Sequence, residues 1–376
     1  MMRACSVAAA HLTARVSVPS TRCTSRSAHV RRTLVTASTS VDDEDGPEIA
    51  PKTSSRLTSS RQNLTLGFIG AGAMAEALAK GFVNGGVADF GDISVSHSGN
   101  ADTAKRWQDL GASVLNSNAE ILDRCDCVFF AVKPHILPQV LNEVGAHVDV
   151  DRHLFVSVAA GVSSQFIEDN LKKSAQGGIA PGRPGPGTAS SSESNFLNKL
   201  TKNKKDEKNT KLISIKTPRV VRVMPNTPCL VNEAASAVSP GTCSTPDDLQ
   251  LVSNLMQSVG LIIQTEERSM DAVVGVSGSG PAYGFLFIEA LADGGVAAGL
   301  PRDVSLKLAA QTLLGAAKMV IETGEHPCVL KDKVCSPGGT TIQAVRALEA
   351  NGFRSAVIEA VLASASRSAE LGGEQK

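Results

Sequence analysis

The 376-residue sequence has no net charge, few aromatic residues and no long uninterrupted apolar run. Its 37 Lys and Arg residues balance 37 Asp and Glu residues, and aromatic residues make up 3% of the chain. A nucleic-acid-binding protein usually carries a basic patch or stripe, and no basic stripe interleaved with aromatic residues is present. No apolar run approaches the roughly 20 residues that a membrane-spanning helix needs. We therefore expect a soluble protein with no nucleic-acid partner and no membrane partner.

The eight cysteines lack the paired spacing of a metal site. Cys5 and Cys23 lie near the N-terminus, and the others form no CxxC pair and have no histidine cluster beside them. Cys125 and Cys127 open an apolar strand. We predict no metal site and buried free thiols in a reducing compartment. No histidine is placed to activate Cys335, so we do not expect it to be a nucleophile.

Acidic residues are missing from the start of the chain as far as Asp42, where arginine, serine, threonine and alanine are frequent. This composition is typical of an organelle transit peptide. We predict that residues 1–60 are a transit peptide and a disordered linker, which would place the mature protein in a plastid or a mitochondrion. The alternative is a disordered tail without a targeting role on a cytoplasmic protein.

A glycine-rich turn follows the first apolar strand. Residues 64–69 form the strand, and residues 70–75, Gly-Ala-Gly-Ala-Met-Ala, match the pattern G-x-G-x-x-A at the start of a helix. Gly70 allows a tight turn, Gly72 allows the backbone to approach a pyrophosphate, and the small Ala75 allows helix and strand to pack closely. With a strand before it and a helix after it, the motif predicts dinucleotide binding rather than a plain strand-to-helix turn.

The second strand, residues 92–96, does not end in the acidic residue that holds the ribose 2′-hydroxyl of NAD. Ser96, His97 and Ser98 occupy this end instead, and the nearest acidic residues lie at the strand's entry. The absence of the acid favours NADPH, with these three residues near its 2′-phosphate. NADH stays possible because the loop contains no arginine.

Further apolar strands at 127–132, 154–159 and 220–224 alternate with helical stretches, which predicts a Rossmann-type, doubly wound parallel sheet. Ligands bind beyond the carboxyl ends of such strands, where this chain has segments 131–134, 159–161 and 224–228. From the composition, residues 173–217 are a disordered insertion. We therefore expect an α/β domain at 61–266 and an all-α domain at 267–376, with many small residues that suit an interlocked dimer.

A second small-residue turn, residues 336–341, reads Ser-Pro-Gly-Gly-Thr-Thr and precedes an amphipathic helix with Ile342, Val345 and Leu348 on one face. The simplest interpretation is that Ser336 and the threonines cap this helix. Alternatively, the unpaired N–H groups around the two glycines bind an anion at the positive end of the helix dipole.

The region 327–349 around this turn, together with FIGAGAMAEALAKGF, AVKP, RVMPNTP, VSGSGPAY and ADGGVAAGLPR, resembles pyrroline-5-carboxylate reductase, the last enzyme of proline synthesis. The resemblance extends from about Leu66 to Leu371, apart from the insertion. Ala73 departs from the family pattern, because relatives often have a polar residue at this position. Neither the insertion nor Ala73 removes a residue to which we assign a role in binding or catalysis.

The resemblance implies hydride transfer from NAD(P)H to the C=N carbon of 1-pyrroline-5-carboxylate, giving L-proline. Thr341, with Ser336 assisting, is the implied catalytic residue and would hydrogen-bond the ring nitrogen. An already protonated iminium or a water would supply the proton. The resemblance also implies a domain-swapped homodimer that assembles into a homodecamer. The substrate carboxylate would bind the turn formed by Ser336, Gly338, Gly339, Thr340 and Thr341.

The predicted cofactor-binding residues are those of the glycine turn and the strand ends around it. They are Ile69, Gly70, Ala71, Gly72, Ala73, Met74, Ser96, His97, Asn118, Val132, Lys133, Pro134, Ala160 and Asn226.

Two other functions are compatible with this domain order. A β-hydroxyacid or 6-phosphogluconate-type dehydrogenase would place a catalytic lysine in the helical domain, and Lys318, Lys331 and Lys333 lie in no such motif. A non-catalytic NADPH-binding scaffold would bind the nucleotide without turning over a substrate.

Overall fold

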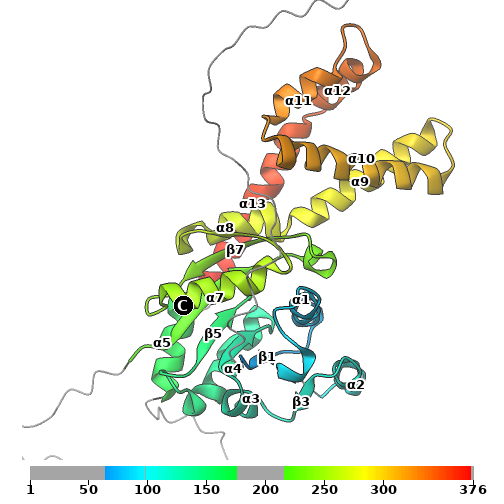
Figure 1. Ribbon diagram of the computed structural model, residues 1–376. Helices are drawn as coiled ribbons and strands as arrows, with labels where there is room; N and C mark the ends of the chain where they lie inside the picture. The colour runs from blue at the N-terminus through cyan, green and yellow to red at the C-terminus, as the bar shows by residue number, and fades with distance from the viewer. Residues whose placement is uncertain (1–63, 98, 176–215, 374–376) are drawn as a thin grey trace, which may run out of the picture. The chain divides into compact units, whose positions relative to one another are not determined.

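The computed structural model describes residues 64–97, 99–175 and 216–373 (Figure 1). The predicted transit peptide lies outside the described residues, as does most of the predicted insertion. Residues 173–175 of that insertion belong to a helix, contrary to expectation. All described residues belong to a single unit by their mutual contacts.

The strands form one eight-stranded sheet with the order β3-β2-β1-β4-β5-β6-β7-β8. Strands β1 to β6 are parallel, β7 runs antiparallel to β6, and β8 is parallel to β7. Their bounds are β1 (Leu66–Ile69), β2 (Ile93–Ser96), β3 (Ser113–Leu115), β4 (Cys127–Phe130), β5 (Leu154–Ser157), β6 (Arg219–Met224), β7 (Ala234–Pro240) and β8 (Gly260–Gln264). The predicted parallel doubly wound sheet is confirmed, and the antiparallel strand β7 is an addition to it.

Helices connect and cover these strands. In the sheet region they are α1 (Ala73–Asn84), η1 (Phe90–Asp92), α2 (Ala101–Asp109), α3 (Asn118–Arg124), η2 (Pro134–Ile136), α4 (Leu137–Val144), η3 (Gly145–His147), α5 (Ser164–Ala175), η4 (Thr227–Val231) and α7 (Pro246–Gln257). The start of α7 is set by neighbouring residues, because Thr245 and Asp248 form a reciprocal capping box there.

After β8 every described element is helical, as predicted. The elements are η5 (Glu267–Ser269), α8 (Met270–Val273), the π-helical η6 (Val274–Gly278), α9 (Gly280–Ala297), α10 (Arg302–Thr323), α11 (Pro327–Val334), α12 (Thr340–Ala350) and α13 (Phe353–Gly373).

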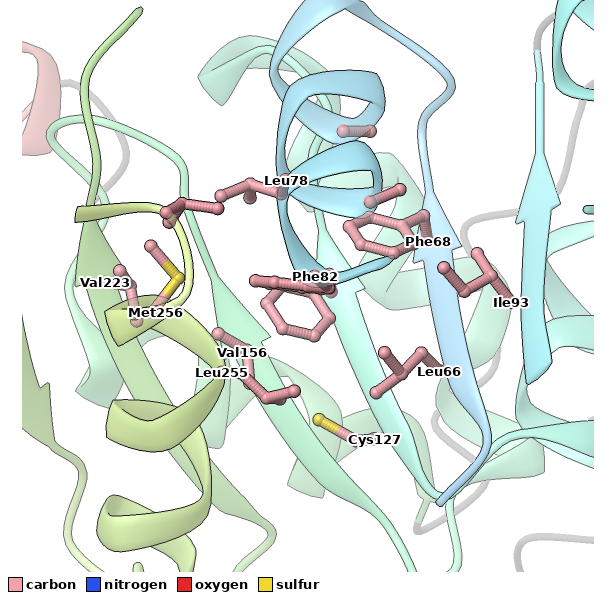
Figure 2. Close-up of a cluster of buried hydrophobic side chains, with 14 of the residues drawn as sticks. Leu66, Phe68, Leu78, Phe82, Ile93, Cys127, Val156, Val223, Leu255 and Met256 are labelled. Atoms are coloured by element: carbon pink, nitrogen blue, oxygen red, sulfur yellow. The ribbon is translucent and has the colours of Figure 1, made fainter. Parts of the chain in front are cut away.

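The sheet has a closed apolar core on each face. Figure 2 shows one of them, in which Phe82 of α1 and Met256 of α7 lie among side chains of the central strands. Phe68 of β1 stacks on Phe129 of β4 with ring centroids 4.9 Å apart. On the other face α3, α4 and α5 pack on the strands. Two buried faces explain why the central strands read as continuous apolar runs.

The helices after β8 leave many apolar side chains in solvent. Among the described residues, α10 is long and apolar enough to cross a membrane by length and composition, and only 11% of its apolar window is buried. The prediction from the sequence concerned an uninterrupted apolar run, and α10 does not contradict it. Lys307, Gln311 and Lys318 interrupt the apolar residues of α10, so its sequence contains no uninterrupted run.

Buried polar contacts join the helical region to the end of the sheet. Arg222 of β6 is 4% exposed and its Nη1 donates to Oε1 of Glu267 at 2.8 Å. Asn226, just beyond β6, donates from Nδ2 to the carbonyl oxygen of Ser277 in η6 at 3.1 Å. These contacts fix the start of the helical region against β6.

Candidate active site

The turn between β1 and α1 requires glycine. Gly70 has φ +104°, and a Cβ there would lie 2.8 Å from the carbonyl oxygen of Ala131 at the end of β4. Its N–H donates to the carbonyl oxygen of Ser96 at 3.2 Å, so the turn also contacts β2. The indole Nε1 of Trp107 donates to the carbonyl oxygen of Ala71 at 3.3 Å. The turn is therefore held by β2, β4 and α2 together.

Gly72 leaves the start of α1 open. It is the N-cap residue, no side chain caps the helix, and a Cβ added to it would meet nothing within 4 Å. The first N–H groups of a helix have no partner within the helix, and they attract an anion together with the helix dipole. A pyrophosphate is the anion that this kind of turn binds.

This turn opens into a cavity of about 540 Å³ beyond the carboxyl ends of β1, β2 and β4. Such a position is where ligands bind in doubly wound sheets, and the volume is in the range of ligand pockets. The lining residues are Gly70, Ala71, Gly72, Ser96, His97, Asn100, Thr103, Asn118, Ala131, Val132, Lys133, Ile136, Gln139, Val140 and Glu143.

Most of the predicted cofactor residues lie in this cavity, and six do not line it. Ile69 is buried beneath the turn, and Ala73, Met74, Pro134, Ala160 and Asn226 lie outside the lining. The amide of Asn226 is occupied, since its Oδ1 accepts from the N–H of Ala235 at 3.0 Å while its Nδ2 contacts Ser277. Asn226 therefore holds two backbone segments together.

Four polar lining residues were not predicted from the sequence to belong to the site. They are Asn100, Thr103, Gln139 and Glu143. Asn100 and Thr103 start α2, where Oδ1 of Asn100 accepts from the N–H of Thr103 at 3.1 Å. The pattern of an Asn before a helical stretch could have indicated this cap. Glu143 comes from α4, and no local sequence signal places it beside β2.

The turn at 336–341 has the geometry of an uncapped helix start. Gly338 has φ +68°, and the N–H of Gly339 donates to the carbonyl oxygen of Ser336 at 3.0 Å. Gly339 is the N-cap residue of α12, and no side chain caps this helix. The interpretation of Ser336 and the threonines as helix caps is therefore wrong. The first N–H groups of α12 are left free for an anion.

Within one chain this turn does not reach the cavity beyond β1, β2 and β4. No residue from 336–341 lines the cavity, and Ser336 and Thr340 are exposed while Thr341 is half-buried. A second cavity of about 490 Å³ lies among the helices instead. Its lining is apolar, apart from the tyrosine hydroxyl, and consists of Tyr283, Leu286, Phe287, Ala290, Leu291, Leu348, Phe353, Ala356, Val357 and Ala360.

The cysteines in the described part of the chain are free, but only some are buried. Burial raises the pKa of the Cys125, Cys127 and Cys229 thiols, so these side chains stay protonated and unreactive. Cys243 and Cys328 are exposed, which contradicts the expectation of uniformly buried thiols.

Comparison with known proteins gives two family matches along the chain. Residues 65–161 match the family described as NADP oxidoreductase, coenzyme F420-dependent. Residues 267–371 match the family described as pyrroline-5-carboxylate reductase dimerisation. Helix α10 lies entirely within this second region.

Two relatives each match most of the chain. Pyrroline-5-carboxylate reductase 2 of Homo sapiens is 43% identical over 309 residues, or 82% of this chain and 84% of that protein. Pyrroline-5-carboxylate reductase of Arabidopsis thaliana is 41% identical over 310 residues, covering 82% of this chain and 96% of the relative.

The crystal structure of the Plasmodium falciparum pyrroline carboxylate reductase with NADP bound superposes with a TM-score of 0.65. It is 30% identical and covers 82% of this chain and 98% of that one. With a glycine turn at a nucleotide-sized cavity, an uncapped Ser-Pro-Gly-Gly-Thr-Thr turn and relatives of this identity and coverage, the chain belongs to the pyrroline-5-carboxylate reductase family.

Proposed function

We propose that the protein reduces 1-pyrroline-5-carboxylate to L-proline with NADPH, and more slowly with NADH, in the final step of proline synthesis. The observation that carries this proposal is the combination of two uncapped helix starts, one at Gly72 and one at Gly339, in a chain with close relatives of that activity. One helix start suits a pyrophosphate and the other suits a carboxylate.

The residues of the cavity fit a dinucleotide. Gly70 and Gly72 leave room for the pyrophosphate, and the end of β2 with Ser96 and His97 forms the adenosine end. Val132 and Lys133 continue the cavity past β4, toward the end that would hold the nicotinamide. When bound, NADPH supplies the hydride. The protein's own part is to orient the two reactants and to exclude water.

The turn before α12 would bind the substrate. The N–H groups around Gly338, Gly339 and Thr340 would hold the carboxylate, and Ser336 would assist. The hydroxyl of Thr341 would hydrogen-bond the ring nitrogen and fix the orientation of the C=N carbon. A water or an iminium protonated in solution would supply the proton, because we assign no other side chain of the turn to this role.

A second copy of the chain would complete the site. The turn carrying Thr341 lines no part of the cavity in one chain, and the helices around it expose large apolar residues such as Leu286 and Ile358. A domain-swapped homodimer would bury these residues and bring the turn of one chain to the cavity of its partner. We propose further assembly of such dimers into a decamer.

The domain division that we propose follows the same roles. Residues 61–266 bind the nucleotide, with the insertion at 173–217 as a surface loop, and residues 267–376 bind substrate and partner. Residues 1–60 would direct the protein to a plastid or a mitochondrion. Expression of the full chain and of a chain starting near Ser60, each fused to a fluorescent protein, tests the targeting role.

The reaction is tested with a chain that starts near Ser60. NADPH absorbance is followed with and without pyrroline-5-carboxylate, and the assay is repeated with NADH. Substrate-dependent loss of absorbance supports the reductase, and the ratio of the two rates gives the coenzyme preference. Folded protein that binds NADPH without such a loss would contradict the proposal and favour a scaffold or a different carbonyl or imine substrate.

A further inference from the structure

An acidic side chain reaches the adenosine end of the cavity from an unexpected element. The end of β2 has no acid, but Glu143 of α4 lines the same cavity as Ser96 and Asn100. Its Oε2 accepts a hydrogen bond from Nδ2 of Asn118 at 2.9 Å. A carboxylate therefore lines this cavity although β2 does not end in an acidic residue.

Glu143 fixes the direction of two successive hydrogen bonds. A carboxylate only accepts, so the amide nitrogen of Asn118 must face it and the amide oxygen must face Ser96. Oγ of Ser96 lies 2.6 Å from this oxygen and must donate its single hydrogen to it. Toward the cavity Ser96 therefore offers lone pairs, which accept from a ribose hydroxyl and repel phosphate oxygens.

Hydrogen-bond donors also line this cavity. Nδ1 of His97 accepts from the N–H of Gly99 at 3.0 Å, so the neutral ring carries its hydrogen on Nε2. Oδ1 of Asn100 is used in capping α2, which leaves the Nδ2 hydrogens available. These donors suit a 2′-phosphate, whereas Ser96 and Glu143 suit a free hydroxyl.

We propose that Glu143 is a specificity-determining residue, which acts through Asn118 and Ser96 and through its charge to favour an unphosphorylated ribose. It lowers the preference for NADPH that His97 and Asn100 create, and it keeps NADH usable. The inference rests on the proposed nucleotide-dependent function and names the residue that sets its coenzyme ratio.

The test measures binding without catalysis. Calorimetric titration of the chain starting near Ser60 with 2′,5′-ADP and with 5′-AMP isolates the effect of the 2′-phosphate, because the two probes differ only in that group. Glu143→Gln removes the charge but keeps an acceptor for Asn118. Glu143→Lys presents donors only and forces the Asn118 amide to turn over. Glu120→Gln is the matched control, because it removes an equal charge from α3 outside the cavity lining.

We expect Glu143→Gln to raise the affinity ratio of 2′,5′-ADP over 5′-AMP roughly tenfold, and Glu143→Lys to raise it further. Equal changes for both probes, or the same shift in Glu120→Gln, would overturn the inference. Wild-type protein that binds both probes but does not reduce pyrroline-5-carboxylate would contradict the proposed function, and the affinity ratio would still be measurable.

Discussion

The sheet region and the helical region of this chain differ in how completely they bury their own apolar residues. Leu66 and Phe68 of β1 are fully buried, whereas Leu286 of α9 is 67% exposed and Ile358 of α13 is 57% exposed. An apolar surface of this extent marks an interaction site. The comparison supports the proposal that the sheet region completes its own site within one chain and that the helical region needs a second copy to complete its site.

The two glycine turns also differ in how far the rest of the chain encloses them. The turn at Gly70 and Gly72 already lies in a cavity with its surroundings in place. The turn at Gly338 and Gly339 has the same uncapped helix start but lies in solvent. Each of the following predictions separates the two regions, beginning with the largest expected effect.

Thr341→Ala should lower kcat/KM for pyrroline-5-carboxylate by roughly 10² to 10³ and leave NADPH affinity unchanged, because the hydroxyl would act on the substrate only. Steady-state kinetics and a nucleotide titration measure the two effects. Thr340→Ala is the neighbouring control and should lose much less, since its backbone N–H is the group assigned to the substrate. Intact turnover in Thr341→Ala would remove this residue from the chemistry.

Leu286→Glu should weaken self-association roughly 100-fold, because a carboxylate would be buried in an apolar interface. Sedimentation velocity over a range of concentrations measures the association. Nucleotide binding should persist in the dissociated chain. Gln108→Glu, at an exposed position of α2, also adds one negative charge and is the control. An unchanged oligomer in Leu286→Glu would show that this part of α9 faces solvent in the assembly.

Gly70→Ala and Gly72→Ala form a matched pair within the nucleotide turn. Gly70→Ala should cost about 2 kcal/mol of unfolding free energy, because its φ is positive and a Cβ would contact Ala131. Gly72→Ala should leave stability nearly unchanged and weaken NADPH binding about tenfold, because only the ligand approaches there. Urea unfolding and nucleotide titration distinguish the two. Equal stability losses would contradict this division of roles.

The buried His153, which belongs to the sheet region, should make the free energy of unfolding depend on pH. The ring is 1% exposed, and burial holds its pKa below the ordinary value of 6.5. Nε2 contacts the carbonyl oxygen of Leu122 at 2.8 Å, and Nδ1 accepts from the N–H of Asp149 at 3.0 Å. Both nitrogens are therefore satisfied in the neutral ring, and protonation of Nδ1 would place a hydrogen against the Asp149 N–H.

Below pH 6.5 the unfolded chain binds a proton that the folded chain refuses, so stability falls as the pH drops. The decrease is at most about 1.4 kcal/mol per pH unit from this residue. His153→Phe should reduce that slope in urea unfolding between pH 7 and 5, whatever its effect on stability at pH 7. A slope equal to that of the wild type would show that other groups carry the pH dependence.

Sequence patterns predicted those parts of the fold that depend on interactions between neighbouring residues. The glycine turn, the apolar central strands and the start of α7 at Thr245 each follow from neighbouring residues. Strands β3 and β7 escaped prediction, because β3 has only three residues and β7 is rich in alanine and serine, which strands do not favour strongly.

The site was harder to predict where distant segments meet. Glu143 shares a cavity with Ser96 because one side of α4, with Gln139, Val140 and Glu143, lines that cavity, and no sequence motif indicates this arrangement. Asn226 stands at the right strand end, but its amide is used by Ala235 and Ser277. The proposed role of the 336–341 turn depends on a second chain, whose position cannot be predicted from the sequence of one chain.

Complementation between two inactive variants tests most directly whether a second copy completes the site. One chain would carry Gly72→Glu, whose Cβ has open space around it and whose carboxylate would lie at the proposed pyrophosphate position, and the other would carry Thr341→Ala. Hybrid dimers isolated through two different tags would hold one site with both defects and one site with neither. We predict that the hybrid regains about half of the wild-type activity. A hybrid as inactive as either parent would show that both turns serve the same chain and would contradict the two-chain site.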